Sequence, residues 1–141
     1  GCSLSQGSVM TRMKNDATIL LIDDDADDRE IFVLALSEAA PTYTCVTARS
    51  GIEALDRLIV GDLRPDCIFL DLNMPRMNGT QCLEGIKKES HLSNIPVVIY
   101  STSSERRDRE NTMSLGASAF ITKPPDISEL IAALENIFAH L

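Results

Sequence analysis

The sequence predicts a doubly wound α/β sandwich, in which helices cover both faces of a parallel sheet. Five short apolar runs recur along the chain, and four of them are continuously apolar, which is typical of strands buried on both faces. A segment with the apolar spacing of a helix follows each run, and this strand–helix repetition favours a parallel sheet. The chain has 141 residues, 44% of them hydrophobic, so it is long enough to bury the core of one such domain.

The predicted elements alternate regularly along the chain. Strands are expected at residues 18–22, 43–48, 67–70, 97–100 and 119–122. Helices are expected over 27–40, from 50 onward, over 79–89, over 104–115, and from 128 onward. Ser50 and Glu53 form a Ser-x-x-Glu capping box, which marks the start of the second helix. The apolar anchors expected on the helices are, in chain order, Phe32, Ala35, Leu36, Ala39, Ile52, Leu55, Ile59, Leu83, Ile86, Met113, Leu115, Leu130, Ile131, Leu134 and Ile137.

The composition excludes several classes of function. A formal net charge of -8 disfavours nucleic acid as a partner and favours a cation or a basic protein surface. No apolar run reaches the length of about 18 residues that a membrane span needs, so no membrane partner is expected. Residues 1–15 are interpreted as a disordered N-terminal extension or a cloning remnant. The four cysteines, at 2, 45, 67 and 82, form no zinc or CxxC pattern and indicate free thiols in the cytoplasm.

Polar residues follow the predicted strands at their carboxyl ends. Asp23, Asp24 and Asp25 follow the first strand, Asp71 follows the third, and Ser101 and Lys123 follow the fourth and fifth. The carboxyl ends of parallel strands meet at one edge of a sheet, where ligands bind in such folds. Clustered carboxylates repel one another and need a cation, and hard oxygen ligands without His or Cys suit Mg²⁺. The nearby lysine and hydroxyl suit an anion such as a phosphoryl group.

Four motifs carry a resemblance to a known family. They are ILLIDD at 19–24, FLDLNMPRMNG at 69–79, IYS at 99–101 and ITKPP at 121–125. Together, in this order, they resemble the receiver domain of a two-component response regulator, over about residues 17–141. The spacing also matches that of the family, because Ser101 lies 30 positions after Asp71 and Lys123 lies 22 positions after Ser101. The resemblance implies a flavodoxin-like receiver domain over 16–141, with strand order 2-1-3-4-5.

The resemblance also implies roles for the acidic residues and the lysine. Asp71 would be the phosphoacceptor for a phosphohistidine. Asp24, Asp71 and the backbone carbonyl of Asn73 would bind Mg²⁺ (or Mn²⁺) directly, with Asp23 acting through a water molecule. Lys123 would pair with Asp71 at rest and then with a phosphoryl oxygen. Receiver domains assist their own phosphorylation and slow dephosphorylation, so the chain is not expected to be a conventional enzyme.

Two residues would form the family's conformational switch. The Ser101 hydroxyl would move toward the phosphoryl group, and Phe120, in place of the usual Tyr, would swing inward. The surface formed by 104–115, strand five and the last helix would then change shape. The partners implied are a sensor histidine kinase or a histidine phosphotransfer protein, and an unknown downstream protein. A stand-alone receiver, monomeric or weakly dimeric, is expected, and the alternative is a fragment of a larger regulator.

Several other interpretations remain open. A haloacid-dehalogenase-like phosphatase would use Asp23 as nucleophile within the Asp23-x-Asp25 pair, but it leaves Asp71 unexplained. An inactive receiver that only binds partners is a third possibility. Asp27 and Asp28 are interpreted as solvated acids at a helix start, and Asp25 as a helix cap. A cis bond before Pro124 is common in the family, and sequence alone gives it a prior of about 5%.

Overall fold

The fold is a flavodoxin-like parallel sheet with helices on both faces. A computed structural model describes residues 15–141. Five parallel strands lie in the order β2-β1-β3-β4-β5, which confirms the predicted order. The strand bounds are Thr18–Ile22 (β1), Thr44–Ala48 (β2), Cys67–Leu70 (β3), Val97–Ser101 (β4) and Ala119–Thr122 (β5).

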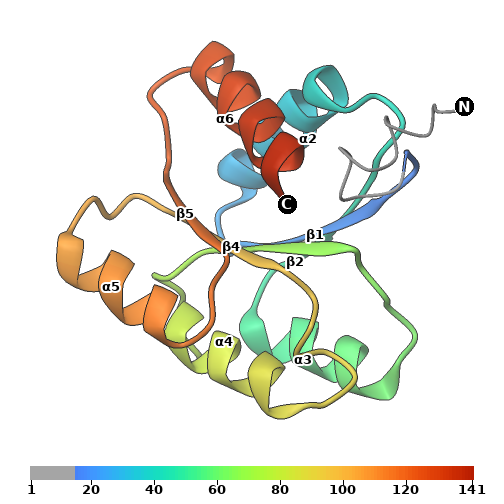
Figure 1. The fold of residues 1–141 in the computed structure, drawn as a ribbon, viewed down its shortest axis with the longest axis vertical. Coiled ribbons are helices and arrows are strands. Elements are labelled where there is room, and N and C mark those ends of the chain that lie inside the picture. The colour runs from blue at the N-terminus through green and yellow to red at the C-terminus, as the bar shows by residue number, and fades with distance from the viewer. Residues whose placement is uncertain (1–14) are drawn as a thin grey trace, which may run out of the picture.

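The helices divide between the two faces of the sheet. In Figure 1 the helices α2 and α6 lie together on one side of the edge-on sheet, and α3, α4 and α5 lie on the opposite side. The first pair is α2 (Ala26–Ala39) and α6 (Ile127–His140). The three opposite are α3 (Gly51–Val60), α4 (Gly79–Lys88) and α5 (Arg106–Ser114). Within residues 15–141, every helix is too short or too polar to cross a membrane.

The core consists of two apolar clusters, one on each face of the sheet. Successive residues of a strand point to opposite faces, so β1 supplies both clusters. Leu20 and Ile22 join the cluster beneath α3 and α4, while Ile19 and Leu21 join the cluster that includes residues of α2 and α6. All four side chains are fully buried. The continuous apolar run in this part of the sequence therefore reflects a strand that is covered on both sides.

The helix starts are set by side-chain caps. Asp25 caps α2 as predicted, because its carboxylate accepts a hydrogen bond from the backbone N–H of Asp28 at 3.0 Å. Ser50 caps α3, but the Glu53 carboxylate accepts from the N–H of Arg49 rather than from that of Ser50, so the predicted capping box is only half formed. A complete capping box occurs instead at Asn78, with Gln81, at the start of α4.

Two helix faces differ from those predicted. Ile52 and Ile59 of α3 are 44% and 48% exposed, while Ala54 and Leu58 of the same helix are fully buried. At 100° per residue, the two isoleucines lie roughly a quarter turn away from the centre of the buried face. In α5 the predicted anchor Met113 is exposed.

Thr112 takes the buried position of α5 in place of Met113. Its hydroxyl donates to the Asp108 carbonyl oxygen at 2.9 Å, which satisfies the polar atom within the helix.

The predicted N-terminal extension lies outside the residues that the structure describes, apart from Asn15, and so does Cys2.

Candidate phosphoryl and metal site

The register of the two central strands places two aspartates side by side. Ile22 of β1 pairs with Leu70 of β3, so the next residues, Asp23 and Asp71, leave the sheet at the same level. Their backbones continue the ladder, since the Asp71 N–H donates to the Ile22 carbonyl oxygen at 3.0 Å. Both side chains are buried, with Asp23 fully covered and Asp71 5% exposed.

Three carboxylates converge at this edge. Among residues 15–141, Asp23, Asp24 and Asp71 each offer an oxygen, and these oxygens lie within 4.8 Å of one another. The set contains only hard oxygen donors, which suits Mg²⁺ or Mn²⁺ better than a metal that prefers nitrogen or sulfur. Two of these carboxylates, those of Asp24 and Asp71, line a cavity of about 350 Å³. The residues lining this cavity are Asp24, Asp25, Asp28, Asp71, Asn73, Thr102 and Lys123.

The electrostatics of the cluster favour a cation. The pKa of Asp71 is raised to about 6, chiefly by burial; the charges of Asp23 and Asp24 also raise this pKa, while Lys123 and the Asn73 N–H lower it. Burial also raises the pKa of Asp23. Ionised carboxylates this close repel one another in a poorly solvated site, and a bound divalent ion would relieve that repulsion.

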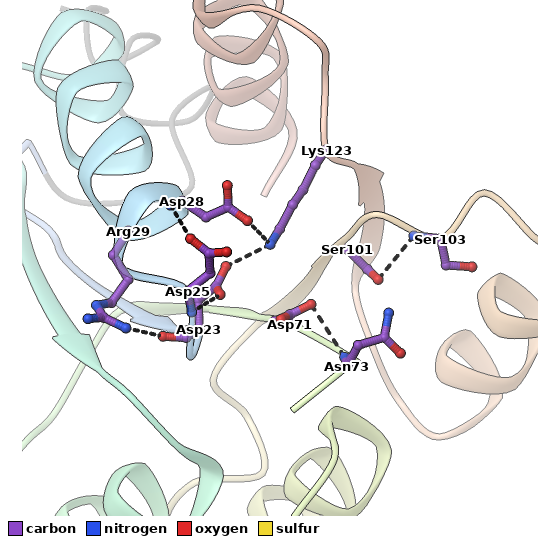
Figure 2. A network of polar contacts seen from close by, with 9 residues as sticks. All are labelled: Asp23, Asp25, Asp28, Arg29, Asp71, Asn73, Ser101, Ser103 and Lys123. Carbon is purple, nitrogen blue, oxygen red and sulfur yellow. Dashed lines mark hydrogen bonds and ion pairs between the residues drawn. The ribbon is translucent and has the colours of Figure 1, made fainter. Parts of the chain in front are cut away.

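The ion pairs of Lys123 differ from the prediction. Within residues 15–141 its ammonium group pairs with Asp23 at 2.8 Å and with Asp28 at 2.7 Å, and not with Asp71 (Figure 2). The prediction of a resting Lys123–Asp71 pair is therefore wrong for this structure. Burial lowers the pKa of Lys123, but its hydrogen bonds to the two aspartates outweigh burial and place the pKa above its ordinary value. The ammonium group also lies 5.1 Å from the centre of the Tyr100 ring.

Asp28 is a site residue that the sequence interpretation missed. It was interpreted as a solvated acid at a helix start, but α2 begins only four residues after β1 ends, so its first turn lies above the carboxyl edge. From there Asp28 reaches Lys123. Arg29 was also missed, and its guanidinium donates to the Asp23 carbonyl oxygen at 2.8 Å. The signal that could have identified Asp28 is the shortness of the loop between strand and helix.

Ser101 and its surroundings form a second polar group beside Asp71 (Figure 2). The Ser101 side chain is fully buried, and its hydroxyl accepts from the Ser103 N–H at 3.2 Å. The Ser103 hydroxyl donates to the Asp108 carboxylate at 2.6 Å, and the Ser103 carbonyl oxygen accepts from the Thr122 hydroxyl at 2.9 Å. The loop after β4 is thus attached to both α5 and β5.

The remaining predicted residues lie close to this edge. The Asn73 N–H donates to an Asp71 carboxylate oxygen at 3.4 Å. Phe120 is partly buried against the core on the α3 and α4 side, and the Arg109 guanidinium lies 5.0 Å from its ring centre. Every peptide bond in the described part of the chain is trans, including the one before Pro124, so the cis bond common in the family does not occur here.

An open parallel sheet with an acidic cluster and a lysine at its carboxyl edge defines a class of α/β domain suited to binding a cation and an anion together. Comparison with known proteins identifies the family within this class. A family model for the response regulator receiver domain matches residues 19–135, and the chain belongs to this family. Receiver domains are signalling domains of two-component systems, and they bind Mg²⁺ or Mn²⁺ at an acidic pocket.

The relatives differ greatly in length. The phosphate regulon transcriptional regulatory protein PhoB of Pseudomonas aeruginosa is 31% identical over 85% of this chain, which spans about half (51%) of PhoB. The two-component response regulator ARR17 of Arabidopsis thaliana is 29% identical over 100% of this chain and 95% of its own length. The comparisons give no support to the haloacid-dehalogenase alternative.

Solved structures show the same fold. The phosphorylated cyanobacterial phytochrome response regulator RcpA superimposes with a TM-score of 0.79 at 33% identity, covering 86% of this chain and 91% of RcpA. The Mn²⁺-bound response regulator Rcp1 gives a TM-score of 0.74 at 28% identity, covering 88% of this chain and 93% of Rcp1.

Proposed function

We propose that Asp71 accepts a phosphoryl group from a histidine kinase or a histidine phosphotransfer protein. The convergence of the Asp71 carboxylate with those of Asp23 and Asp24, within 4.8 Å, carries this proposal. Asp71 is buried at the end of a central strand, and its carboxylate lines the cavity. A phosphoryl donor bound in the cavity would therefore lie next to a carboxylate oxygen of Asp71. The haloacid-dehalogenase alternative, in which Asp23 is the nucleophile, is less suitable because the residues lining the cavity include Asp71 and not Asp23.

The reaction is a transfer from nitrogen to oxygen. An Asp71 oxygen attacks phosphorus, the phosphorus–nitrogen bond of the phosphohistidine breaks, and the departing imidazole takes a proton from solvent. The product is an acyl phosphate on Asp71. Such a transfer depends chiefly on positioning and on neutralising the phosphoryl charge. Lys123 and the Ser101 hydroxyl are the groups of this chain proposed to bind phosphoryl oxygens.

The residues present fit a divalent ion. Asp24, Asp71 and the Asn73 backbone carbonyl would hold Mg²⁺ or Mn²⁺, with Asp23 acting through water. When bound, the ion supplies positive charge that offsets the carboxylates and the phosphoryl oxygens. The Mn²⁺-bound structure of Rcp1 is a related fold carrying such an ion.

The proposed output is a change of surface. Movement of the Ser101 hydroxyl toward the phosphoryl group withdraws it from the Ser103 N–H, and Phe120 takes up the space that Ser101 leaves. The surface of α5, β5 and α6 then changes shape for an unknown downstream protein. We propose signalling by protein contact from a cytoplasmic receiver that is monomeric or weakly dimeric.

A phytochrome-type kinase is the first upstream partner to test. RcpA, at 33% identity, is a phytochrome response regulator, and the bacteriophytochrome response regulators AtBRR and RtBRR are each 32% identical to this chain. These likenesses support the same class of donor for this chain. A panel of purified kinases that includes a phytochrome kinase would show which one transfers phosphoryl to it fastest.

The proposal is tested by intact-protein mass spectrometry after incubation with Mg²⁺ and phosphoramidate. A single phosphoryl adduct is expected in the wild type and in Asp27→Asn, an exposed acid outside the cavity lining, and the adduct is expected to be lost in Asp71→Asn. An adduct that persists in Asp71→Asn would overturn the assignment. Continuous hydrolysis of small phosphate esters, abolished by Asp23→Asn, would instead favour a phosphatase.

A further inference from the structure

Two carboxylates from different elements hold the Lys123 ammonium group. Asp23, after β1, lies 2.8 Å from it, and Asp28, in the first turn of α2, lies 2.7 Å from it. Figure 2 shows the ammonium group between these two side chains, while Asp71 lies to one side and bonds to the Asn73 N–H. Lys123 in this state is therefore directed toward α2.

Asp28 differs from the carboxylates proposed to bind metal. It is not among the three residues whose oxygens converge within 4.8 Å, although it lines the same cavity. Its backbone is held by the Asp25 side chain, which accepts its N–H at 3.0 Å, and the Asp25 N–H in turn donates to Asp23 at 2.9 Å. The position of Asp28 is thus fixed relative to the site, and its carboxylate accepts a hydrogen bond from the Lys123 ammonium group.

We infer that Asp28 is a positioning residue that holds Lys123 away from Asp71 until a phosphoryl group is present. This inference rests on the proposed function. To reach a phosphoryl oxygen on Asp71, Lys123 must break its short hydrogen bond to Asp28. A hydrogen bond between charged groups is stronger than one between neutral groups, so the release opposes phosphorylation.

The inference gives a direction for the rate of phosphorylation. In Asp28→Asn the hold on Lys123 is weaker and one negative charge is absent. We expect the maximum rate of phosphorylation by phosphoramidate to rise about three- to tenfold, since the pair is partly exposed and worth only a modest free energy. The concentration of phosphoramidate that gives half the maximum rate should change much less, because Asp28 acts through Lys123. Asp28→Glu, which keeps the charge and the hydrogen bond, should restore a rate near that of the wild type.

The matched control is Asp27→Asn. Asp27 is an exposed acid in the same turn and is not part of the cavity lining, so this variant makes the same change of net charge without touching Lys123. Its phosphorylation rate should stay within about twofold of the wild type, because an exposed charge is largely screened by salt. A comparison of the two asparagine variants therefore separates the hold on Lys123 from the general effect of net charge.

A second measurement needs no phosphoryl donor. The ¹⁵N-ammonium resonance of Lys123 should be visible in the wild type, in Asp27→Asn and in Asp28→Glu, because hydrogen bonds slow its proton exchange. It should broaden or shift in Asp28→Asn. A rate in Asp28→Asn that equals that in Asp27→Asn, or falls below it, would overturn the inference.

The two proposals fail in different ways. If the wild type gains no phosphoryl adduct, the proposed function fails, and the Lys123 resonance alone then decides whether Asp28 holds the lysine. An unchanged resonance in Asp28→Asn would show that it does not. A melting curve for each variant shows whether it is folded, and folding is expected because the Asp28 side chain is about one third exposed (32%).

Discussion

Gly79, the first residue of α4, lies directly against the backbone of Asp71. A Cβ atom at position 79 would be 2.3 Å from the Asp71 carbonyl oxygen and 2.6 Å from the Leu72 Cα. The Gly79 N–H donates to the Leu72 carbonyl oxygen at 2.9 Å, which holds the two segments together. Because both obstacles are backbone atoms, neither can turn aside as a side chain would.

We therefore expect Gly79→Ala to destabilise the fold by several kcal/mol and to displace Asp71, since forced overlaps of this kind cost about 1–3 kcal/mol or more. Urea unfolding measures the free energy, and the change of melting temperature with added Mg²⁺ reports the site. Gly85→Ala is the control. Its Cβ would meet the flexible end of the Leu55 side chain at 2.8 Å, so the expected loss is much smaller. Equal losses in the two variants would contradict this account.

Asp71 is expected to make the metal-free protein less stable as pH rises. Burial first, and then the charges of Asp23 and Asp24, raise its pKa to about 6 from an ordinary value of 3.8. Folding therefore favours the protonated form, so the stabilising contribution is complete below pH 3.8 and is lost as pH rises through about 6. The difference of about two pKa units corresponds to roughly 2–3 kcal/mol.

The measurement is urea unfolding in EDTA between pH 4.5 and 7.5. The free energy of unfolding of the wild type should fall more steeply with rising pH across this range than that of Asp71→Asn. At pH 7.5 Asp71→Asn should be the more stable of the two. Added Mg²⁺ should raise the stability of the wild type more than that of the variant. A variant that is less stable than the wild type at pH 7.5 without metal would refute the electrostatic explanation.

The sheet and the location of the site could be predicted because both depend on the backbone pattern. Residues 19–22 (ILLI) are apolar at every position, which is typical of a strand covered on both faces, and this part of β1 is so covered. Once the sheet is parallel, its carboxyl ends share one edge. With the strand order that the family resemblance implies, Asp23 and Asp71 are then neighbours, as the pairing of β1 with β3 confirms. A hydrophobic pattern extends over a whole strand, so the prediction of the strand holds even where one position is misjudged.

The contacts that were not predicted depend on individual side chains. The choice of Lys123 between Asp71 and the Asp23–Asp28 pair is decided by where the first turn of α2 places Asp28, which no periodicity specifies. Ile52 is expected to face the core because it is apolar, but α3 turns the face that contains Ala54 and Leu58 toward the core instead. The close approach of Gly79 to Asp71 could not be predicted, because the sequence shows only Asn78-Gly79, a pair that is common in turns.

The cysteine thiols provide a test of the core that is independent of the site. Burial raises the pKa of Cys67 and Cys82 to about 12 and that of Cys45 to about 11. Thiolate, and not thiol, reacts with iodoacetamide, so at pH 8 all three should react far more slowly than in unfolded protein. Cys67 and Cys82 are fully buried and should be the slowest. Peptide mapping after timed labelling, with and without urea, measures each site, and rapid labelling of Cys67 in the native protein would contradict the buried position of β3.

The Ser103 hydroxyl should hold the loop after β4 to α5. It donates to the Asp108 carboxylate at 2.6 Å and accepts from the Glu105 N–H at 3.2 Å, so Ser103→Ala removes both contacts at once. We expect faster amide hydrogen exchange over residues 102–108 and a small loss of stability of about 1 kcal/mol, because hydrogen bonds to a charged group in a partly buried loop contribute at this scale.

Ser104→Ala, at the exposed neighbouring position, is the control and should leave exchange unchanged. Since the Ser103 N–H also bonds to the buried Ser101 hydroxyl, faster exchange confined to Ser103→Ala would show that the loop beside the phosphoryl site is restrained from the α5 side. Exchange that is the same in both variants would mean that the Asp108 contact adds nothing to that restraint.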